Sequence, residues 1–357
     1  MPTTPVARGA TTRAVFIDKL GPPDALVERE VPLDDPGPGE VHVRVQACGV
    51  NFADLMMRAG LYGTVPARPF SPGFEVAGIV ERVGSGVEGW APGQRAIGLL
   101  RHGGYAGDVV VPANQLFPCP DSLSPVEAAA IPVVFLTAWV CLFEAARARA
   151  GETVLILGAG GGVGTAAVQL ATRHGMRVLG TAGTAEKRGF VVGSLGAEAC
   201  FDSHGDWEYE VQTALGHRGL HIALDPVGGS ATVACRGLLA PLGRLVFYGL
   251  SQALPGDRRS WVEAWRAWRA TPKMHPTQLV EPNIGVFGVH LLHLGHRQLD
   301  VLAPALEEIF RRVALGELAP VIDSTFSLDR AGAVEAHAYL HARRNLGKVV
   351  LVSPEAR

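Results

Sequence analysis

Strong net charge and long apolar runs are both missing from this chain of 357 residues. Its 32 lysines and arginines nearly balance 34 aspartates and glutamates, so neither a nucleic acid nor an anionic membrane surface is favoured as a partner. No apolar run reaches the roughly 18 residues that a membrane-spanning helix needs. Residues 1–13 lack the apolar core of a secretory signal. We therefore expect a soluble cytoplasmic protein.

Cysteine is scarce as well. The five cysteines are scattered along the chain and form no Cys-x-x-Cys pair. An odd, dispersed set in a chain without a secretory signal indicates reduced, mostly buried thiols. The set also excludes a structural zinc site held by four cysteines.

Glycine, in contrast, is concentrated in one turn. An apolar strand candidate, 154–157, leads into five glycines within the seven residues 158–164, and a helical pattern follows at 165–171. Such a turn lets the backbone approach a dinucleotide pyrophosphate, which the N–H groups and dipole of the following helix then hold. Ala159 takes the first glycine position of the usual Gly-x-Gly-x-x-Gly pattern. The predicted contacts are Ala159, Gly160, Gly161, Gly162, Val163 and Gly164.

Two patterns follow one another along the chain. Before about residue 130, short strand candidates (41–47, 74–80 and 108–111) are separated by Gly and Pro, which indicates a compact β unit. From Ser124, a predicted helix N-cap, strands and helices alternate, which predicts βαβ units and a parallel sheet. The alternating elements are 154–157, 163–174, 177–181, 186–195, 220–224, 230–239 and 244–248.

Residues 251–280 interrupt this alternation. Trp261, Trp265 and Trp268 would share one face of a short helix, which fits either packing on the domain or a lid over an apolar cleft. A last strand candidate, 284–289, follows, and then a helix-rich stretch from about residue 298.

The chain resembles the medium-chain dehydrogenase/reductase superfamily, and within it the zinc-free quinone oxidoreductase branch. That branch includes zeta-crystallin, the vesicle amine transport protein homologues and enoyl reductases. The first motif is an Asn-x-x-Asp segment that begins at Asn51, followed by Gly-Leu-Tyr at 60–62. The matching segments occur in family order at 48–62, 72–78, 103–106, 136–138, 161–164, 225–229 and 347–350.

The resemblance implies an α/β fold in which a Rossmann doubly wound parallel sheet is inserted into a GroES-like β-barrel domain. The expected boundaries are 1–131 for the first part of the catalytic domain, 132–298 for the Rossmann domain with its 251–280 insertion, and 299–357 for the return. It also implies a homodimer joined at the edge strand 284–289, with the active site in the cleft between domains.

The resemblance also bears on metal binding. Zinc alcohol dehydrogenases of this superfamily carry Cys where this chain has Asn51 and His where it has Phe74. An amide and a phenyl ring cannot replace the thiolate and imidazole ligands of a catalytic zinc. His290, His293 and His296 are spaced at i, i+3 and i+6, so on a helix their side chains would turn progressively around the axis. This spacing favours exposed or capping roles for them. We expect no metal.

The second strand of the Rossmann unit indicates which nicotinamide is bound. No carboxylate stands at its tip, where NAD-binding units place one for the ribose hydroxyl. Thr184 and Lys187 offer a hydroxyl and a cation for the 2′-phosphate of NADPH, and Arg188 a second cation. Lys187 also fits a solvated surface lysine, and Ser203 stands where relatives often carry Tyr. The resemblance adds Thr181, Gly183, Tyr248, Val286, Phe287, Gly288, Val289 and Lys348 to the cofactor site; for Lys348 a surface position fits equally.

Four residues are candidates for catalysis. Asn51 would hold the substrate carbonyl or the nicotinamide ribose, and Asp54 would orient Asn51 or its loop. The proton donor is either Tyr62 or water. Thr137 would pack under the nicotinamide ring.

Together these features predict a zinc-independent, NADPH-dependent reductase of a carbon–carbon double bond conjugated to a carbonyl, in a quinone, enone or enoyl thioester. A dedicated enoyl-CoA reductase is the nearer alternative, because Arg258, Arg259, Arg266 and Arg269 could bind the phosphates of coenzyme A. The same arginines could equally form the solvent-exposed face of the tryptophan-containing helix. The alternative of another class is a non-catalytic NADPH-binding protein.

Overall fold

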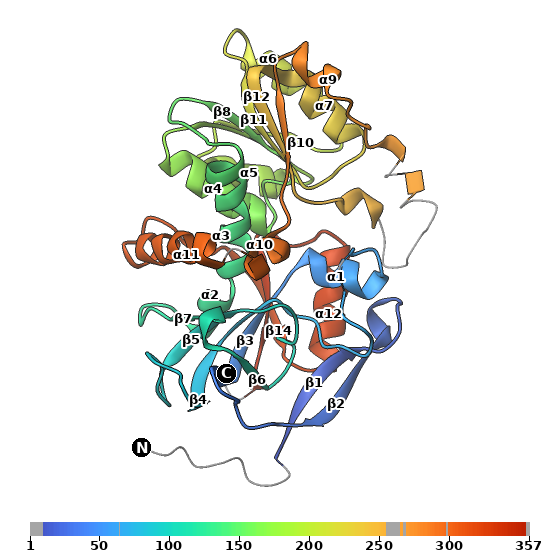
Figure 1. Ribbon diagram of the computed structural model, residues 1–357. Coiled ribbons are helices and arrows are strands. Elements are labelled where there is room, and N and C mark those ends of the chain that lie inside the picture. The colour runs from blue at the N-terminus through green and yellow to red at the C-terminus, as the bar shows by residue number, and fades with distance from the viewer. Residues whose placement is uncertain (1–9, 64, 255–264, 267–268, 298, 355–357) are drawn as a thin grey trace. The chain divides into compact units, whose positions relative to one another are not determined.

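The computed structural model describes residues 10–63, 65–254, 265–266, 269–297 and 299–354 (Figure 1). They form two compact units. The first combines the described residues up to Val133 with those from Ile322 onward, and the second comprises those between Val134 and Val321. No helix in the described ranges is long and apolar enough to cross a membrane.

The first unit is built on a seven-stranded sheet in the order β14-β15-β3-β4-β5-β7, with β6 paired to β3. Strands β1 and β2 form a separate antiparallel pair. The strands predicted at 41–47, 74–80 and 108–111 correspond to β3, β4 and β6. The strands are β1 (Thr11–Ile17), β2 (Leu26–Pro32), β3 (Glu40–Val50), β4 (Glu75–Val83), β5 (Arg95–Leu99), β6 (Asp108–Pro112), β7 (Leu116–Pro118), β14 (Ile322–Ser327) and β15 (Lys348–Val352).

The order of these strands brings distant parts of the chain together. Strand β15 lies between β14 and β3, so residues from the C-terminal region pair directly with the strand that leads to Asn51. The helices of this unit are η1 (Pro23–Ala25), α1 (Phe52–Ala59), η2 (Ala113–Gln115), α2 (Pro125–Ala129) and α12 (Arg330–His341). Ser124 caps α2 as predicted, because its side chain accepts from the backbone N–H of Glu127.

The second unit contains a six-stranded parallel sheet in the order β10-β9-β8-β11-β12-β13. This is the doubly wound arrangement, in which the strand order reverses beside β8. Figure 1 shows the sheet between α4 and α5 in green and α6 and α7 in yellow. Its strands are β8 (Thr153–Ile156), β9 (Arg177–Ala182), β10 (Ala199–Asp202), β11 (Leu220–Asp225), β12 (Leu239–Phe247) and β13 (Gly285–Gly288).

The helices of the second unit are α3 (Pro132–Trp139), which begins just before this unit, η3 (Val140–Ala145), α4 (Gly162–Arg173), α5 (Ala185–Gly193), α6 (Trp207–Leu215), α7 (Ser230–Leu238), η4 (Ser251–Ala253), α9 (Thr277–Val280), α10 (Leu291–Arg297) and α11 (Leu299–Ala314). Helices α4, α5, α6 and α7 connect strands of the sheet and pack against it.

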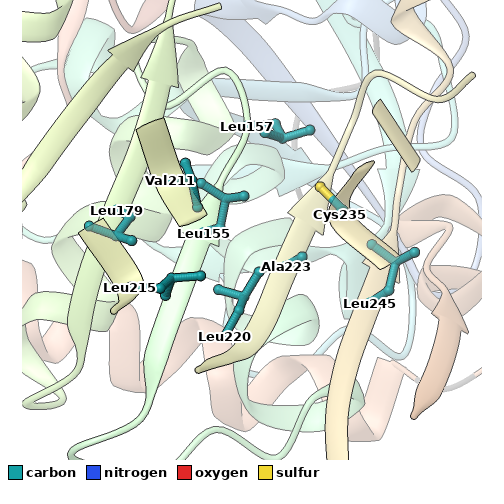
Figure 2. Close-up of a cluster of buried hydrophobic side chains, with 9 residues drawn as sticks. All are labelled: Leu155, Leu157, Leu179, Val211, Leu215, Leu220, Ala223, Cys235 and Leu245. Atoms are coloured by element: carbon teal, nitrogen blue, oxygen red, sulfur yellow. The ribbon is translucent and has the colours of Figure 1, made fainter. Parts of the chain in front are cut away.

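An apolar core fills one face of this sheet. Figure 2 shows leucines of β8, β9, β11 and β12 meeting side chains of α6 and α7. Cys235 of α7 belongs to this cluster and is completely buried, and burial raises the pKa of its thiol. All five cysteines are free, and Cys48 and Cys141 are buried too.

The structure differs from the sequence expectations at three places. Strand β10 and helix α6 were not predicted. The chain returns to the first unit at Ile322 rather than at 299. The reason is that α11 packs within the second unit: Leu306 and Ile309 are fully buried, and the Arg312 guanidinium lies 5.7 Å from the ring centroid of Trp139.

The tryptophan-rich stretch is described only in part. Trp261 and Trp268 lie outside the described residues, as do Arg258 and Arg259. Trp265 is 53% exposed. The lid and the packing helix therefore both stay predictions.

Candidate functional site

The glycine-rich turn lies between β8 and α4, at the point where the strand order of the sheet reverses. Gly158 adopts a φ of +66°, and its carbonyl accepts a hydrogen bond of 2.9 Å from Gly161 N. A Cβ on Gly164 would lie 2.2 Å from that same carbonyl oxygen. The third glycine of the pattern is thus required for the helix to start this close to the strand.

The alanine in the first glycine position is accommodated by the neighbouring strand. Ala159 is fully buried, and a Cβ on Gly180 of β9 would lie only 2.8 Å from the Ala159 methyl group. Thr181, the next residue of β9, holds the turn: its carbonyl accepts from Ala159 N at 2.8 Å and its hydroxyl from Gly158 N at 3.3 Å. The departure from the usual pattern therefore leaves the turn intact.

The predicted 2′-phosphate residues lie at the start of α5. Thr184 is the N-cap of this helix and accepts from Lys187 N at 3.3 Å. The aliphatic part of Lys187 packs over the glycine turn, 3.1 to 3.3 Å from where a Cβ on Gly160 would be. The structure thus brings the lysine and the turn together, and Glu186, in the first turn of the same helix, is exposed to solvent.

The other predicted cofactor residues of the second unit lie on three elements. Thr137 is 8% exposed in α3. Tyr248 follows β12 and donates its backbone N–H to Asp225 at 3.0 Å. Strand β13 contains residues 286–288 at the edge of the sheet, and Val289 N bonds to the Phe247 carbonyl at 2.9 Å.

In the first unit, Asn51 is the N-cap of α1 and is 8% exposed. Its side chain is held at both ends. Nδ2 donates to Glu75 Oε1 at 2.8 Å and to the Gly49 carbonyl at 3.4 Å, and Oδ1 accepts from Lys348 Nζ at 2.5 Å. These contacts fix which end of the amide is the donor.

Glu75 and Lys348 also form a buried ion pair, with 2.6 Å between Nζ and Oε1. Their side chains are 0% and 3% exposed. The second carboxylate oxygen of Glu75 accepts from Val133 N at 2.8 Å. Lys348 is therefore buried rather than a surface residue, and Glu75 and Asn51 are partners of its ammonium, while its place in the cofactor site stays a prediction.

Asp54 joins two loops of the site. Its carboxylate accepts from Asn51 N at 2.8 Å and from Gly73 N at 2.9 Å. Burial raises the pKa of Asp54 from 3.8 to about 7, against the lowering effect of these two hydrogen bonds and of Lys348. The carboxyl group thus bonds to the backbone of the Asn51 loop, where its predicted orienting role stays a prediction, and it titrates near neutral pH.

Tyr62 lies near the same loop. Its ring centroid is 6.3 Å from that of Phe74, and it is partly exposed. Burial, and next the charge of Asp54, raise the pKa of its phenol, so the hydroxyl keeps its proton at neutral pH. The arrangement leaves Tyr62 able to donate a hydrogen bond or a proton.

The comparisons with known proteins agree with this geometry. Residues 37–121 match the alcohol dehydrogenase GroES-like domain, and residues 195–351 match the zinc-binding dehydrogenase model. The chain is 36% identical over 319 residues to the synaptic vesicle membrane protein VAT-1 homolog of Rattus norvegicus, covering 89% of this chain and 78% of that protein. It is 31% identical over 343 residues to the quinone oxidoreductase of Rattus norvegicus, covering 95% and 97%. The chain belongs to the medium-chain dehydrogenase/reductase superfamily, in its quinone oxidoreductase-like part.

Solved structures support the same assignment. Quinone oxidoreductase of Escherichia coli, in complex with NADPH, matches with a TM-score of 0.84 and 26% identity over 95% of this chain and 99% of that chain. The quinone oxidoreductase of Thermus thermophilus, also described with NADPH, matches with a TM-score of 0.78 and 37% identity, over 95% of this chain and 99% of that chain. The CurK enoyl reductase matches with a TM-score of 0.83 and 27% identity, over 97% of this chain and 100% of that chain. The fold is thus a GroES-like domain with an inserted Rossmann unit.

The resemblance predicts that Asn51 and Phe74 occupy the positions of zinc ligands in other superfamily members. Phe74 is 1% exposed and offers only its ring. Among the residues that the structure describes, no three His, Cys, Asp or Glu side chains gather as a metal site. His290 and His293 stack edge to face at 4.5 Å between ring centroids.

Sequence reasoning missed a buried hydrogen-bonded chain behind the site. Arg58 Nε donates to His337 Nδ1 at 3.2 Å, and His337 Nε2 lies 3.1 Å from the Tyr105 hydroxyl. Burial, and next the charge of Asp54, raise the pKa of the Tyr105 phenol. Arg58, Tyr105 and His337 are fully buried. Burial lowers the pKa of His337, with Arg58 and His341 adding to the effect, so the imidazole stays neutral. No local motif marks these residues, because they come from separate segments of the chain.

Proposed function

We propose that this protein is a zinc-independent, NADPH-dependent reductase that adds hydride to a carbon–carbon double bond conjugated to a carbonyl. The observation that carries the proposal is the buried trio of Asn51, Glu75 and Lys348. It holds a fixed amide and an ammonium side by side, and the resemblance puts Asn51 where zinc members of the superfamily would have a metal ligand.

The residues of the second unit fit a dinucleotide. Five of the seven residues in the turn at 158–164 are glycines, which contribute no side chains to cover its backbone, and the aliphatic part of Lys187 packs beside it. Residues 159–164 would hold the pyrophosphate, Thr184 and Lys187 the 2′-phosphate, and Thr137, Tyr248 and residues 286–289 the nicotinamide end. NADPH, when bound, supplies the hydride.

The first unit would stabilise the charge that develops on the substrate. When hydride reaches the β-carbon, the electrons of the double bond move toward the carbonyl oxygen. Lys348 has three N–H groups, and its contacts with Asn51 and Glu75 use two of them. A buried ammonium acts strongly on such an oxygen because little water screens it.

Asn51 would work as an acceptor rather than a donor. Its N–H groups point to Glu75 and Gly49, so the remaining capacity is the second lone pair of Oδ1. This favours contact with a hydroxyl, such as that of the nicotinamide ribose, over contact with the substrate carbonyl. The proton that completes the reaction comes from Tyr62 or from water.

The experiment is NADPH oxidation with EDTA present, against matched panels of quinones, enones and short enoyl-CoA thioesters. Turnover of quinones and enones supports the proposal, and preferential turnover of the thioesters would identify an enoyl reductase, the class of the CurK neighbour. Loss of activity in EDTA would refute the metal-free assignment. NADPH binding without turnover of any panel would favour a non-catalytic protein.

A pair of variants ties the activity to the site. Asn51→Ala should lower kcat/KM about 5-fold to 150-fold, because the loss of one buried hydrogen-bonding group costs about 1–3 kcal/mol. Asn114→Ala, at an exposed position of η2, is the matched control and should leave kcat/KM unchanged. Equal activity of the two variants would remove Asn51 from the mechanism.

We also propose a homodimer joined along β13. This strand is at the edge of the sheet, and Phe287 on it is 43% exposed. Analytical ultracentrifugation of the wild type should give a molecular mass twice that of the chain. The substitution Phe287→Lys should shift the measured mass toward that of the monomer.

A further inference from the structure

A histidine just after β10 lies beside the start of α5. A Cβ on Gly183 would be 3.0 Å from His204 Nε2 and 3.5 Å from Ser203 Oγ. Gly183 directly precedes the N-cap Thr184, and both His204 and Ser203 are exposed. The imidazole therefore reaches the place where β9 ends and α5 begins.

The arginine expected to contact the phosphate is committed elsewhere. Arg188 Nη1 lies 2.9 Å from Asp202 Oδ2 and 3.3 Å from the Ala182 carbonyl. The sequence interpretation of Arg188 as a second phosphate cation is not supported, because a carboxylate already neutralises its charge.

The same carboxylate holds the histidine loop. Asp202 Oδ1 accepts from His204 N at 2.9 Å, while Oδ2 faces Arg188. Asp202 thus anchors the loop from one side, and its own charge is balanced. The ring of His204 is presented toward Gly183, so its Nε2 faces the start of α5.

We propose that His204 binds the 2′-phosphate of NADPH together with Lys187 and Thr184, and that it makes the cofactor preference depend on pH. The inference rests on the proposed use of NADPH. A phosphate between a lysine and a protonated imidazole receives charge-assisted hydrogen bonds from both, whereas the hydroxyl of NADH gains little. Histidine is the side chain that changes charge between about pH 5 and pH 8.

The charged groups on the two segments that meet here are few. The histidine loop contributes Asp202 and Asp206, and the first turn of α5 contributes Glu186, Lys187 and Arg188. The opposite charges of Asp202 and Arg188 offset each other in their ion pair. The phosphate titrates as well, with a second pKa near 6, so its own charge strengthens binding as pH rises. That effect is opposite in sign to the effect of His204.

The test compares His204→Gln and His204→Ala with wild type, and uses His217→Ala as the control at an exposed histidine of the same unit. Adenosine 2′,5′-bisphosphate, NADPH and NADH are titrated calorimetrically between about pH 6 and pH 8. The phosphate titrates in the same way with every variant. The ratio of the wild-type binding affinity to that of His204→Gln therefore measures the contribution of the imidazole alone.

We expect His204→Ala to weaken binding of the bisphosphate and NADPH about threefold to tenfold near pH 6, with NADH changed less than twofold. The ratio of wild-type to His204→Gln affinity should approach one near pH 8. A ratio that does not vary with pH, or equal losses for NADPH and NADH, would overturn the inference while leaving NADPH use intact. Absence of NADPH binding to wild type would instead refute the proposed function.

Discussion

Replacing Lys348 by methionine should expose the energetic role of the buried trio. The substitution removes the ammonium but keeps the length and apolar stem of the side chain. Glu75, which is fully buried, would keep only the amide of Asn51 and the N–H of Val133 as partners for its charge. Breaking a buried ion pair in this way costs about 3–5 kcal/mol. The double variant Lys348→Met/Glu75→Gln carries no buried charge at these positions and should recover at least about 2 kcal/mol of that loss.

Amide hydrogen exchange, measured by mass spectrometry on peptides of β3 and β15, reports the loss of stability in the first unit. A loss of about 4 kcal/mol should speed exchange there roughly a thousandfold, while peptides of β8 and β11 keep wild-type protection. Two results would contradict a buried ion pair between Lys348 and Glu75. One is a stability loss in the double variant equal to the sum of the two single-variant losses, and the other is a loss in Lys348→Met below about 1 kcal/mol. Glu75→Gln alone completes the cycle.

Three further predictions concern the turn, the buried carboxyl group and the phosphate site. Gly164→Ala should abolish NADPH binding in a fluorescence titration, because its Cβ would meet the Gly158 carbonyl at 2.2 Å, whereas Gly189→Ala, with open space around it, should bind normally. The raised pKa of Asp54 means that folding favours its protonated form, so the stability it contributes is complete below about pH 4 and is lost as pH rises through about 7. Urea unfolding across this range should show wild type losing up to about 4 kcal/mol relative to Asp54→Asn, and parallel pH curves would contradict the assignment. Lys187→Ala should raise KM for NADPH and leave NADH nearly unaffected, and equal effects on both would remove Lys187 from the phosphate site.

The parts of the fold with strong local patterns could be predicted from the sequence. The apolar run of β8, the glycines after it and the helix α4 are contiguous, so their order along the chain nearly equals their order in space. Strand β10 was missed because its four residues offer too short a pattern to register. The late return to the first unit was missed because α11 is amphipathic, and such a helix fits either unit equally well from sequence alone.

The candidate site shows the same division. Asn51 and Asp54 belong to one short motif, and their connection could be predicted. Lys348 could be placed in a motif, but not beside Asn51, because 297 residues separate them and nothing local encodes the register of β15 against β3. Glu75 lies in the family segment 72–78, directly after Phe74, but its contacts with Lys348 and Asn51 could not be predicted, because these residues lie far from it in the sequence.

The separation of Asn51 from Lys348 also affects how the site assembles. Closing a flexible loop of 297 residues costs about 5 kcal/mol of chain entropy. Prior folding of the inserted unit, 134–321, would shorten the flexible part of that loop to roughly 110 residues and lower this cost by about 1 kcal/mol. Folding of the second unit therefore favours formation of the ion pair in the first unit by about fivefold, and most of the closure cost stays with the first unit's own segments. A lesion in the glycine turn would thus weaken assembly of the Asn51 site only slightly, even though the turn lies within the loop that separates Asn51 from Lys348.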